Sequence, residues 1–198
     1  MKKKWDEIHS YLLDKSTPHH KLHNIIHLNG VLKVKKSPEK NLFKFMCRIV
    51  LGQQLSTKAA QTIWLRLENL CNENDKELSE LCEDYYFETI RSSGLSKNKT
   101  KAIIMLNQSF KEKEISSSKL QKLDERELKD FISDLWGFGP WSAEMILLGY
   151  FGSLDIWSNN DSALVRGINL ALGKQKKTHD EIIKLFSPYR TLLSRHIW

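Results

Sequence analysis

Apolar residues recur every three to four positions along most of the chain, which is the spacing of the buried face of an α-helix. The clearest run places five apolar residues on one helical face: Leu42, Phe45, Met46, Ile49 and Val50. Only four prolines and nine glycines interrupt such runs, and the strict alternation typical of a half-buried strand is scarce. The pattern therefore predicts an all-α protein.

Small polar residues predict where individual helices begin. Ser56 precedes a face with five apolar residues: Ala59, Ala60, Ile63, Trp64 and Leu67. Asp124 and Glu127 have the spacing of a capping box, which would open another amphipathic helix. The segment 111–122 is rich in Lys, Glu and Ser, and we interpret it as a solvated connection between helices.

The stretch 135–143 reads Leu-Trp-Gly-Phe-Gly-Pro-Trp-Ser-Ala. Gly137 and Gly139 allow a tight turn with positive φ angles, and Pro140 suits the first turn of the helix that follows. The stretch predicts a helix-hairpin-helix motif over about residues 125–150, whose outward N–H groups would hold a DNA phosphate. An ordinary helix–helix turn has the same local pattern.

An apolar run from Trp141 to Phe151 predicts the second helix, and a polar loop then leads to Asp161. Asp161 stands 161 − 141 = 20 residues after Trp141 and begins a further helical pattern. The position suits an N-cap, because an aspartate there accepts hydrogen bonds from the first free N–H groups of a helix. On local pattern alone, capping explains this residue.

The charge balance narrows the choice of partner. Across 198 residues the chain has 31 Lys and Arg against 24 Asp and Glu, a net charge of +7. Such an excess indicates an anionic partner, of which nucleic acid is the commonest, although a basic protein without a polyanionic partner has the same composition.

The three cysteines, Cys47, Cys71 and Cys82, are odd in number and widely spaced. They favour neither a disulfide framework nor a zinc or iron–sulfur site, and they fit a reducing compartment. The segment from Met1 to Asp14 lacks the pattern of a signal peptide, and no apolar run is long enough to span a membrane. We therefore expect a protein of the cytoplasm or nucleoid, or of the nucleus in a eukaryote, with no membrane partner.

Further segments match a known family in the same order along the chain. They are residues 49–56 (Ile-Val-Leu-Gly-Gln-Gln-Leu-Ser), 94–96 (Gly-Leu-Ser) followed by Lys99 and Ala102, 188–190 (Pro-Tyr-Arg) and 196–198 (His-Ile-Trp). Together with the hairpin and Asp161, they resemble the helix-hairpin-helix DNA glycosylase superfamily, in its 3-methyladenine DNA glycosylase II branch, over roughly residues 5–198.

The resemblance implies an all-α fold of two helical lobes with an active-site cleft between them. We expect a central lobe over residues 41–153, which contains the hairpin, and a second lobe formed by residues 1–40 and 154–198. The implied activity is that of a DNA glycosylase of base excision repair, which flips an alkylated purine such as 3-methyladenine or 7-methylguanine out of the duplex and hydrolyses its N-glycosidic bond.

Asp161 is the expected catalytic residue, because a carboxylate stabilises the oxocarbenium-like transition state and assists the attack of water. Relatives with an additional β-lyase step have a lysine nucleophile at the position of Trp141, so that this chain is expected to be monofunctional. Asp155 aligns with an upstream aspartate of the family, and we assign it a structural role.

The resemblance also implies which residues surround the substrate. Four aromatic residues are expected in the base pocket, where a cationic alkylated base would bind by cation–π attraction: Trp141, Trp198, Trp157 and Tyr189. The expected DNA-contacting residues are Gln53, Gln54, Leu55, Ser56, Gly137, Phe138, Gly139, Pro140 and Ser142. Gln54 is the expected wedge into the base stack, although either glutamine could simply face solvent at a helix end. The remaining tryptophans Trp5, Trp64 and Trp136 are expected to pack in the core.

The expected partner is double-stranded DNA that contains damaged bases, bound by a monomer. We expect no organic cofactor and no metal held by side chains, although His19, His20, His23 and His27 form a cluster for which zinc is conceivable. A monovalent cation at the hairpin carbonyls is consistent with the family. Two alternatives stay open: a glycosylase for an oxidised or mismatched base, and a helix-hairpin-helix module that binds DNA without cutting it.

Overall fold

The structure is a computed structural model that describes residues 2–198. It contains thirteen α-helices and two short helical segments, with no strand among the described residues, so the all-α prediction is confirmed. The chain divides into two compact units at residues 36/37 and 146/147, where the sequence led us to expect boundaries at 40/41 and 153/154. None of the helices in the described part is long and apolar enough to cross a membrane.

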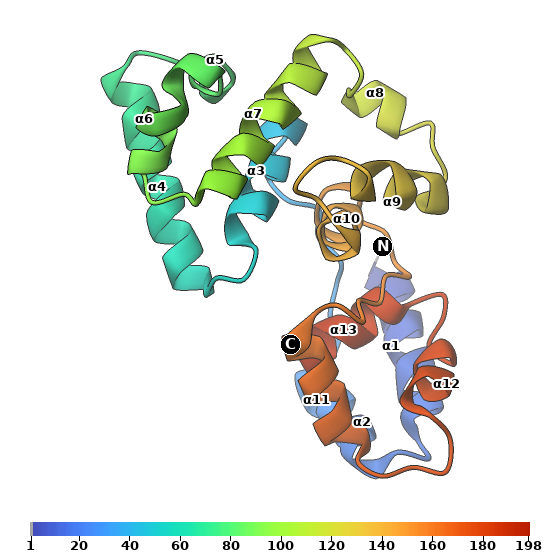
Figure 1. Cartoon of the computed structure of the whole chain (residues 1–198). Coiled ribbons are helices and arrows are strands. Elements are labelled where there is room, and N and C mark those ends of the chain that lie inside the picture. The colour runs from blue at the N-terminus through green and yellow to red at the C-terminus, as the bar shows by residue number, and fades with distance from the viewer. Residues whose placement is uncertain (1) are drawn as a thin grey trace. The chain divides into compact units, whose positions relative to one another are not determined.

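Unit 1 joins the two ends of the chain, and Figure 1 shows its N-terminal helices beside its C-terminal ones. Its elements are α1 (Lys2–Ser16), α2 (His20–Asn29), the π-helical segment η2 (Leu147–Phe151), α11 (Ser162–Leu172), α12 (His179–Lys184) and α13 (Arg190–Ile197). Their apolar faces share one core, which includes Leu12, Ile26, Ile168, Phe186 and Leu193. Helix α2 packs against α1, α11 and α13, so the unit is assembled from segments far apart in sequence.

Unit 2 spans Ser37–Ile146. Its elements are α3 (Leu42–Gly52), α4 (Thr57–Glu73), α5 (Leu78–Leu81), η1 (Asp84–Tyr86), α6 (Phe87–Ser92), α7 (Lys97–Lys111), α8 (Ser117–Leu120), α9 (Glu125–Ser133) and α10 (Pro140–Ile146). Helix α3 is central because seven of its eleven residues are buried, and it packs against α4, α7 and α10.

The predicted helix starts are confirmed by their hydrogen bonds. Ser56 Oγ accepts from the N–H of Ala59 at the start of α4. At the start of α9, Asp124 accepts from the N–H of Glu127 while the Glu127 carboxylate accepts from the N–H of Asp124, which is the predicted capping box. These bonds satisfy N–H groups that have no partner within the helix.

Two expectations about burial are wrong. The segment 111–122 is not simply a solvated connection, because it contains α8 and buries Ile115 and Leu120. Trp136 is not a core residue, since its side chain is 39% exposed and the Lys101 ammonium lies 4.7 Å from the ring centroid. Its ring lies beside α7 and so forms a cation–π pair at the surface. Trp64 is buried and Trp5 packs at the edge of the unit 1 core, as expected.

Candidate functional site

The hairpin between α9 and α10 closes on a hydrogen bond from the N–H of Phe138 to the carbonyl of Leu135, 2.9 Å long. Gly137 has a φ of +82°, and a Cβ added there would lie 2.5 Å from Cβ of Ala102. Both facts require glycine at this position. Gly139 has no positive φ and a Cβ there would meet no atom within 4 Å, so the expectation that both glycines need positive φ holds for Gly137 only.

An ion pair ties the two helices of the hairpin together. Lys129 Nζ on α9 lies 2.6 Å from Glu144 Oε1 on α10, and the Glu144 side chain is only 5% exposed. Pro140 begins α10, and the N–H of Ala143 donates to the carbonyl of Gly139 as the first bond of that helix. Helix α10 therefore starts at the residue that the sequence predicted for its first turn.

The side chain of Gln53 binds the hairpin. Its Nε2 donates to the carbonyl oxygen of Gly137 and is also within hydrogen-bond distance of Ser142 Oγ, at 2.9 Å in each case. The backbone of the same residue is held by Lys99 on α7, whose Nζ donates to the carbonyls of Leu51 at 2.8 Å and Gln53 at 2.7 Å. Burial lowers the pKa of Lys99.

Gln54 differs from its neighbour in both conformation and exposure. Its φ is +56°, in the left-handed region that residues other than glycine rarely adopt, and its side chain is exposed. Leu55 beside it is 39% exposed, and Ser56 then caps α4. Strained conformations of this kind cost about 1–3 kcal/mol and persist where the surrounding structure imposes them, often at functional sites.

Asp161 is the N-cap of α11 in unit 1. Its Oδ1 accepts a hydrogen bond from the N–H of Leu164 at 2.8 Å and a longer one from Trp198 Nε1 at 3.3 Å. Trp198, the last residue described, therefore reaches the predicted catalytic carboxylate while half of its surface stays exposed. The bond from Trp198 joins the end of α13 to the start of α11.

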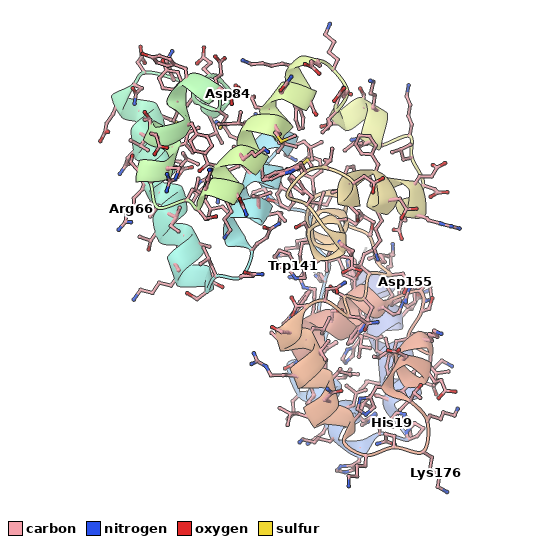
Figure 2. The ribbon with its side chains drawn as sticks, viewed as in Figure 1. His19, Arg66, Asp84, Trp141, Asp155 and Lys176 are labelled. Atoms are coloured by element: carbon pink, nitrogen blue, oxygen red, sulfur yellow. The ribbon has the colours of Figure 1, made fainter. Side chains whose placement is uncertain are left out.

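The loop that leads to Asp161 is anchored by Asp155 (Figure 2). The Asp155 carboxylate accepts bonds from Nε, Nη2 and the N–H of Arg190, at 2.8 to 3.1 Å, and from the hydroxyl of Ser187 at 2.8 Å. Burial by itself would raise the pKa of Asp155, but the hydrogen bonds from Arg190 and Ser187 outweigh it and lower the pKa. Ser158 is buried in the same loop.

The four aromatic residues expected in the base pocket lie in different surroundings. Trp198 touches Asp161, as described. Trp157 and Tyr189 pack against the core of unit 1, where Tyr189 meets the ring of Tyr11 edge-on at 5.4 Å and Trp157 Nε1 donates to Asn159 Oδ1. Trp141, labelled in Figure 2, is the second residue of α10, in unit 2. Its side chain is partly exposed.

No group of three or more His, Cys, Asp or Glu side chains in the described part of the chain is arranged to hold a metal ion. Within the histidine cluster, His23 Nδ1 lies 3.0 Å from Ser16 Oγ and 3.1 Å from the carbonyl of Leu13. Of the hairpin carbonyls, those of Leu135 and Gly137 each accept a hydrogen bond. A monovalent cation at the hairpin stays a prediction.

Lys99 and Arg190 have no role predicted from the sequence, although both lie in segments that resemble the family. The available signal was the position of Lys99 directly before Thr100, Ala102 and Ile103, all of which are buried on α7. A lysine beside such a face can extend its ammonium group to neighbouring carbonyls.

A profile of the HhH-GPD superfamily of base excision DNA repair proteins matches residues 47–189 of this chain. The matched region includes Gln53, Gln54, the hairpin and Asp161.

Individual proteins of known name are similar over most of the chain. The alkylbase DNA glycosidase-like protein mag2 of Schizosaccharomyces pombe is 27% identical over 175 residues, which cover 85% of this chain and 82% of the relative. The crystal structure of a DNA-3-methyladenine glycosidase from Bacillus halodurans has a TM-score of 0.73 and 25% identity, covering 93% of this chain and 85% of that one. A 3-methyladenine DNA glycosylase of S. pombe, solved in complex with abasic DNA, has a TM-score of 0.82 at 22% identity, with 97% and 95% covered.

Proposed function

Because this chain belongs to the HhH-GPD superfamily of base excision DNA repair proteins, we propose that it is a monofunctional DNA glycosylase that hydrolyses the N-glycosidic bond of alkylated purines. The family predicted from the sequence is confirmed by the profile match. The substrate class follows from the similarity to proteins named as alkylbase or 3-methyladenine DNA glycosidases.

The observation that carries the proposed activity is the setting of Asp161. Its carboxylate stands at the N-terminus of α11, and Oδ1 accepts bonds from Leu164 N–H and Trp198 Nε1. These donors and the positive end of the helix stabilise the ionised carboxylate and orient it. An oriented carboxylate is the group that a developing oxocarbenium ion requires.

The proposed reaction is a displacement by water at C1′ of the damaged nucleotide. The bond between C1′ and the purine nitrogen breaks, and its electron pair neutralises the positive charge of the alkylated base. The oxygen of water then bonds to C1′, and Asp161 accepts the proton that water loses. The products are the free base and an abasic site in the DNA.

Trp141 favours hydrolysis without strand cleavage. A lyase step needs an amine nucleophile that forms a Schiff base with C1′, and an indole has no such group. The same ring offers an electron-rich face that attracts a cationic base, an interaction of about 0.5–2 kcal/mol. We therefore propose that the ring of Trp141 contacts the alkylated base. We propose the same role for Trp198, because its indole bonds to Asp161.

The proposed partner is double-stranded DNA with damaged bases, bound by one copy of the chain, in the nucleoid or nucleus where such DNA is found. Exposed Gln54 and Leu55 are the proposed contacts with the base stack. The outward N–H groups of the hairpin around Gly139 are the proposed phosphate contacts.

The activity is tested with duplex DNA treated with a methylating agent. The wild-type protein is expected to release 3-methyladenine and 7-methylguanine and to leave unbroken abasic strands. Asp161→Asn keeps an N-cap residue but removes the negative charge, so release should fall at least about a hundredfold while DNA affinity is retained. Asp124→Asn is the matched control, since it makes the same change at the N-cap of α9.

Each part of the proposal has its own contrary outcome. If the wild-type protein binds DNA and releases no base, it is a binding module. Release of 8-oxoguanine or of a mismatched base instead of methylated purines would assign a different lesion. Equal rates for Asp161→Asn and the wild type would remove Asp161 from catalysis.

A further inference from the structure

The end of α3 adjoins two segments that the proposed function assigns to DNA. Gln54 and Leu55 follow it in the sequence, and the hairpin around Gly139 is joined to it through the side chain of Gln53. The last carbonyls of a helix have no partner within it, and a cation is the group best suited to satisfy them. Lys99 on α7 fills this role, because its Nζ donates to the carbonyls of Leu51 and Gln53 at 2.8 and 2.7 Å. The two bonds hold the final turn of α3 to α7.

The position of Lys99 is itself restrained. Its N–H donates to the hydroxyl of Ser96, the N-cap of α7, and Thr100 and Ala102 beside it are buried where α7 packs on α3. The ammonium group is partly removed from water, and the resulting desolvation lowers its pKa. Lys99 is therefore placed by the core of unit 2 and directed at the end of α3.

The bond to Gln53 acts on the wedge residue that follows. The Gln53 carbonyl belongs to the same rigid peptide unit as the nitrogen of Gln54. A bond to that carbonyl therefore restrains the peptide plane from which φ of Gln54 is measured. Gln54 has a φ of +56° and is exposed. A conformation of this cost needs restraints from its surroundings, and Lys99 supplies one next to it.

Lys99 is also linked to the hairpin through Gln53, whose backbone it binds. The Nε2 atom of Gln53 donates to the Gly137 carbonyl and lies at the same distance from Ser142 Oγ. The backbone of Gly137 also packs on Ala102, three residues beyond Lys99 and hence on the same face of α7. One face of α7 thus contacts both segments.

Resting on the proposed function, we propose that Lys99 is a positioning residue that sets the conformation of Gln54 and holds it in register with the hairpin. A duplex then meets the wedge and the phosphate-binding turn in one fixed arrangement. Lys99 acts through the backbone of α3 and the side chain of Gln53, without contacting DNA.

Three variants separate this role from a general effect of charge. Lys99→Met keeps the aliphatic stem and removes the donors, and Lys99→Arg keeps both the charge and the donors. Lys111→Met is the matched control, because it removes one positive charge from the other end of the same helix, where Lys111 pairs with Glu83.

The first measurement is amide hydrogen exchange of the protein without DNA. Lys99→Met should exchange faster than the wild type at residues 53–57 and 136–142, while the amides of α9 and of unit 1 are unchanged. Lys99→Arg should restore most of the protection, and Lys111→Met should leave both segments as in the wild type.

The second measurement compares affinity for a duplex with a tetrahydrofuran abasic-site analogue against an undamaged duplex. Lys99→Met should reduce the preference for the abasic analogue about tenfold, because only that complex needs the wedge in place. Lys111→Met should change both affinities by the same factor, as loss of a distant charge does.

Unchanged exchange at both segments in Lys99→Met overturns the proposal, as does an equal loss of affinity for both duplexes, which would make Lys99 a phosphate contact. If Lys99→Met does not fold, Gln53→Met cuts only the link to the hairpin, and faster exchange at 136–142 is then the expected result. A wild-type protein that releases no methylated base refutes the proposed function, whereas the exchange data still decide the role of Lys99.

Discussion

At the residue scale, capping and catalysis are compatible roles for Asp161. The cap uses Oδ1, which accepts from the N–H of Leu164, and an ionised carboxylate has about four acceptor positions on its two oxygens. The cap restrains the rotamer, and a restrained carboxylate loses less freedom in the transition state. A residue that holds a helix start in place is therefore well suited to hold a charge beneath a sugar.

His196 shows a different effect of burial. It is 4% exposed on α13, its ring centroid lies 5.9 Å from that of His9, and the Nδ1 atoms of both rings are buried without a hydrogen-bond partner in the described structure. Burial, followed by the proximity of His9, lowers the pKa of His196 from 6.5 to about 4. The folded protein thus holds this ring in its neutral form.

The low pKa of His196 predicts a loss of stability in acid. As the pH falls from 6.5 toward 4, the unfolded chain binds a proton at His196 that the folded chain does not bind. The stability associated with the neutral His196 ring is therefore complete above pH 6.5 and is lost across this window. The difference between the two pKa values of His196 corresponds to about 3 kcal/mol of unfolding free energy. Urea unfolding at several pH values should show this slope in the wild type.

His196→Leu is the variant that isolates the effect, because it removes the titrating group. Between pH 6.5 and 4, the unfolding free energy of His196→Leu should fall by about 3 kcal/mol less than that of the wild type. A smaller pH dependence should remain in the variant, because the pKa of His9 is also lowered. Asp155 contributes little in this window, since its pKa is lowered from 3.8 and most of its titration lies below about pH 4, and its contribution is the same in both proteins. Parallel curves for variant and wild type would contradict the assignment.

At the element scale, the two glycines of the hairpin differ in what requires them. Gly137 needs both its positive φ and its missing Cβ for the fold, whereas Gly139 has an unstrained conformation and free space where a Cβ would stand. Folding therefore explains the first glycine and leaves the second unexplained. A phosphate close to the backbone would explain the second.

Two alanine variants test this difference. Gly137→Ala should lower the free energy of unfolding by about 2–3 kcal/mol, from the left-handed φ and the contact with Ala102. Gly139→Ala should leave stability within about 0.5 kcal/mol of the wild type but weaken DNA binding about tenfold. Urea unfolding and titration with a fluorescent duplex measure the two effects. Normal DNA affinity for Gly139→Ala would argue against the hairpin as the phosphate contact.

At the scale of the whole molecule, a net charge of +7 leaves a surplus of cations, which the proposed function would direct at DNA phosphates. Few of these cations form buried ion pairs. The best-buried ion pairs join Arg190 to Asp155 and Lys129 to Glu144, while most other ion pairs lie at the surface. Exposed pairs contribute little to folding, so we expect the charge to act mainly on association.

The surplus predicts that binding to undamaged duplex DNA depends strongly on salt. If about four phosphates are neutralised, affinity should fall about a hundredfold between roughly 50 and 200 mM salt. Fluorescence anisotropy across a series of salt concentrations measures the slope. A slope close to zero would mean that the positive charge does not meet the DNA backbone.

The sequence by itself was sufficient for the features that depend on neighbouring residues. Helical periodicity, the caps at Ser56 and Asp124, the start of α10 at Pro140 and the turn at Gly137 all involve groups within about four positions of each other. The order of the motifs along the chain was sufficient for the family, which the profile match confirms.

Only the tertiary structure decided which groups meet across long separations. Gln53 reaches the hairpin 84 residues away, Lys99 bonds to a carbonyl 48 residues back, and Trp198 bonds to Asp161 across 37 residues. Periodicity marks a face as buried or exposed, yet it carries no information about which distant face lies opposite. For that reason the sequence could not separate the inward role of Gln53 from the exposed position of Gln54, or place Trp136 at the surface.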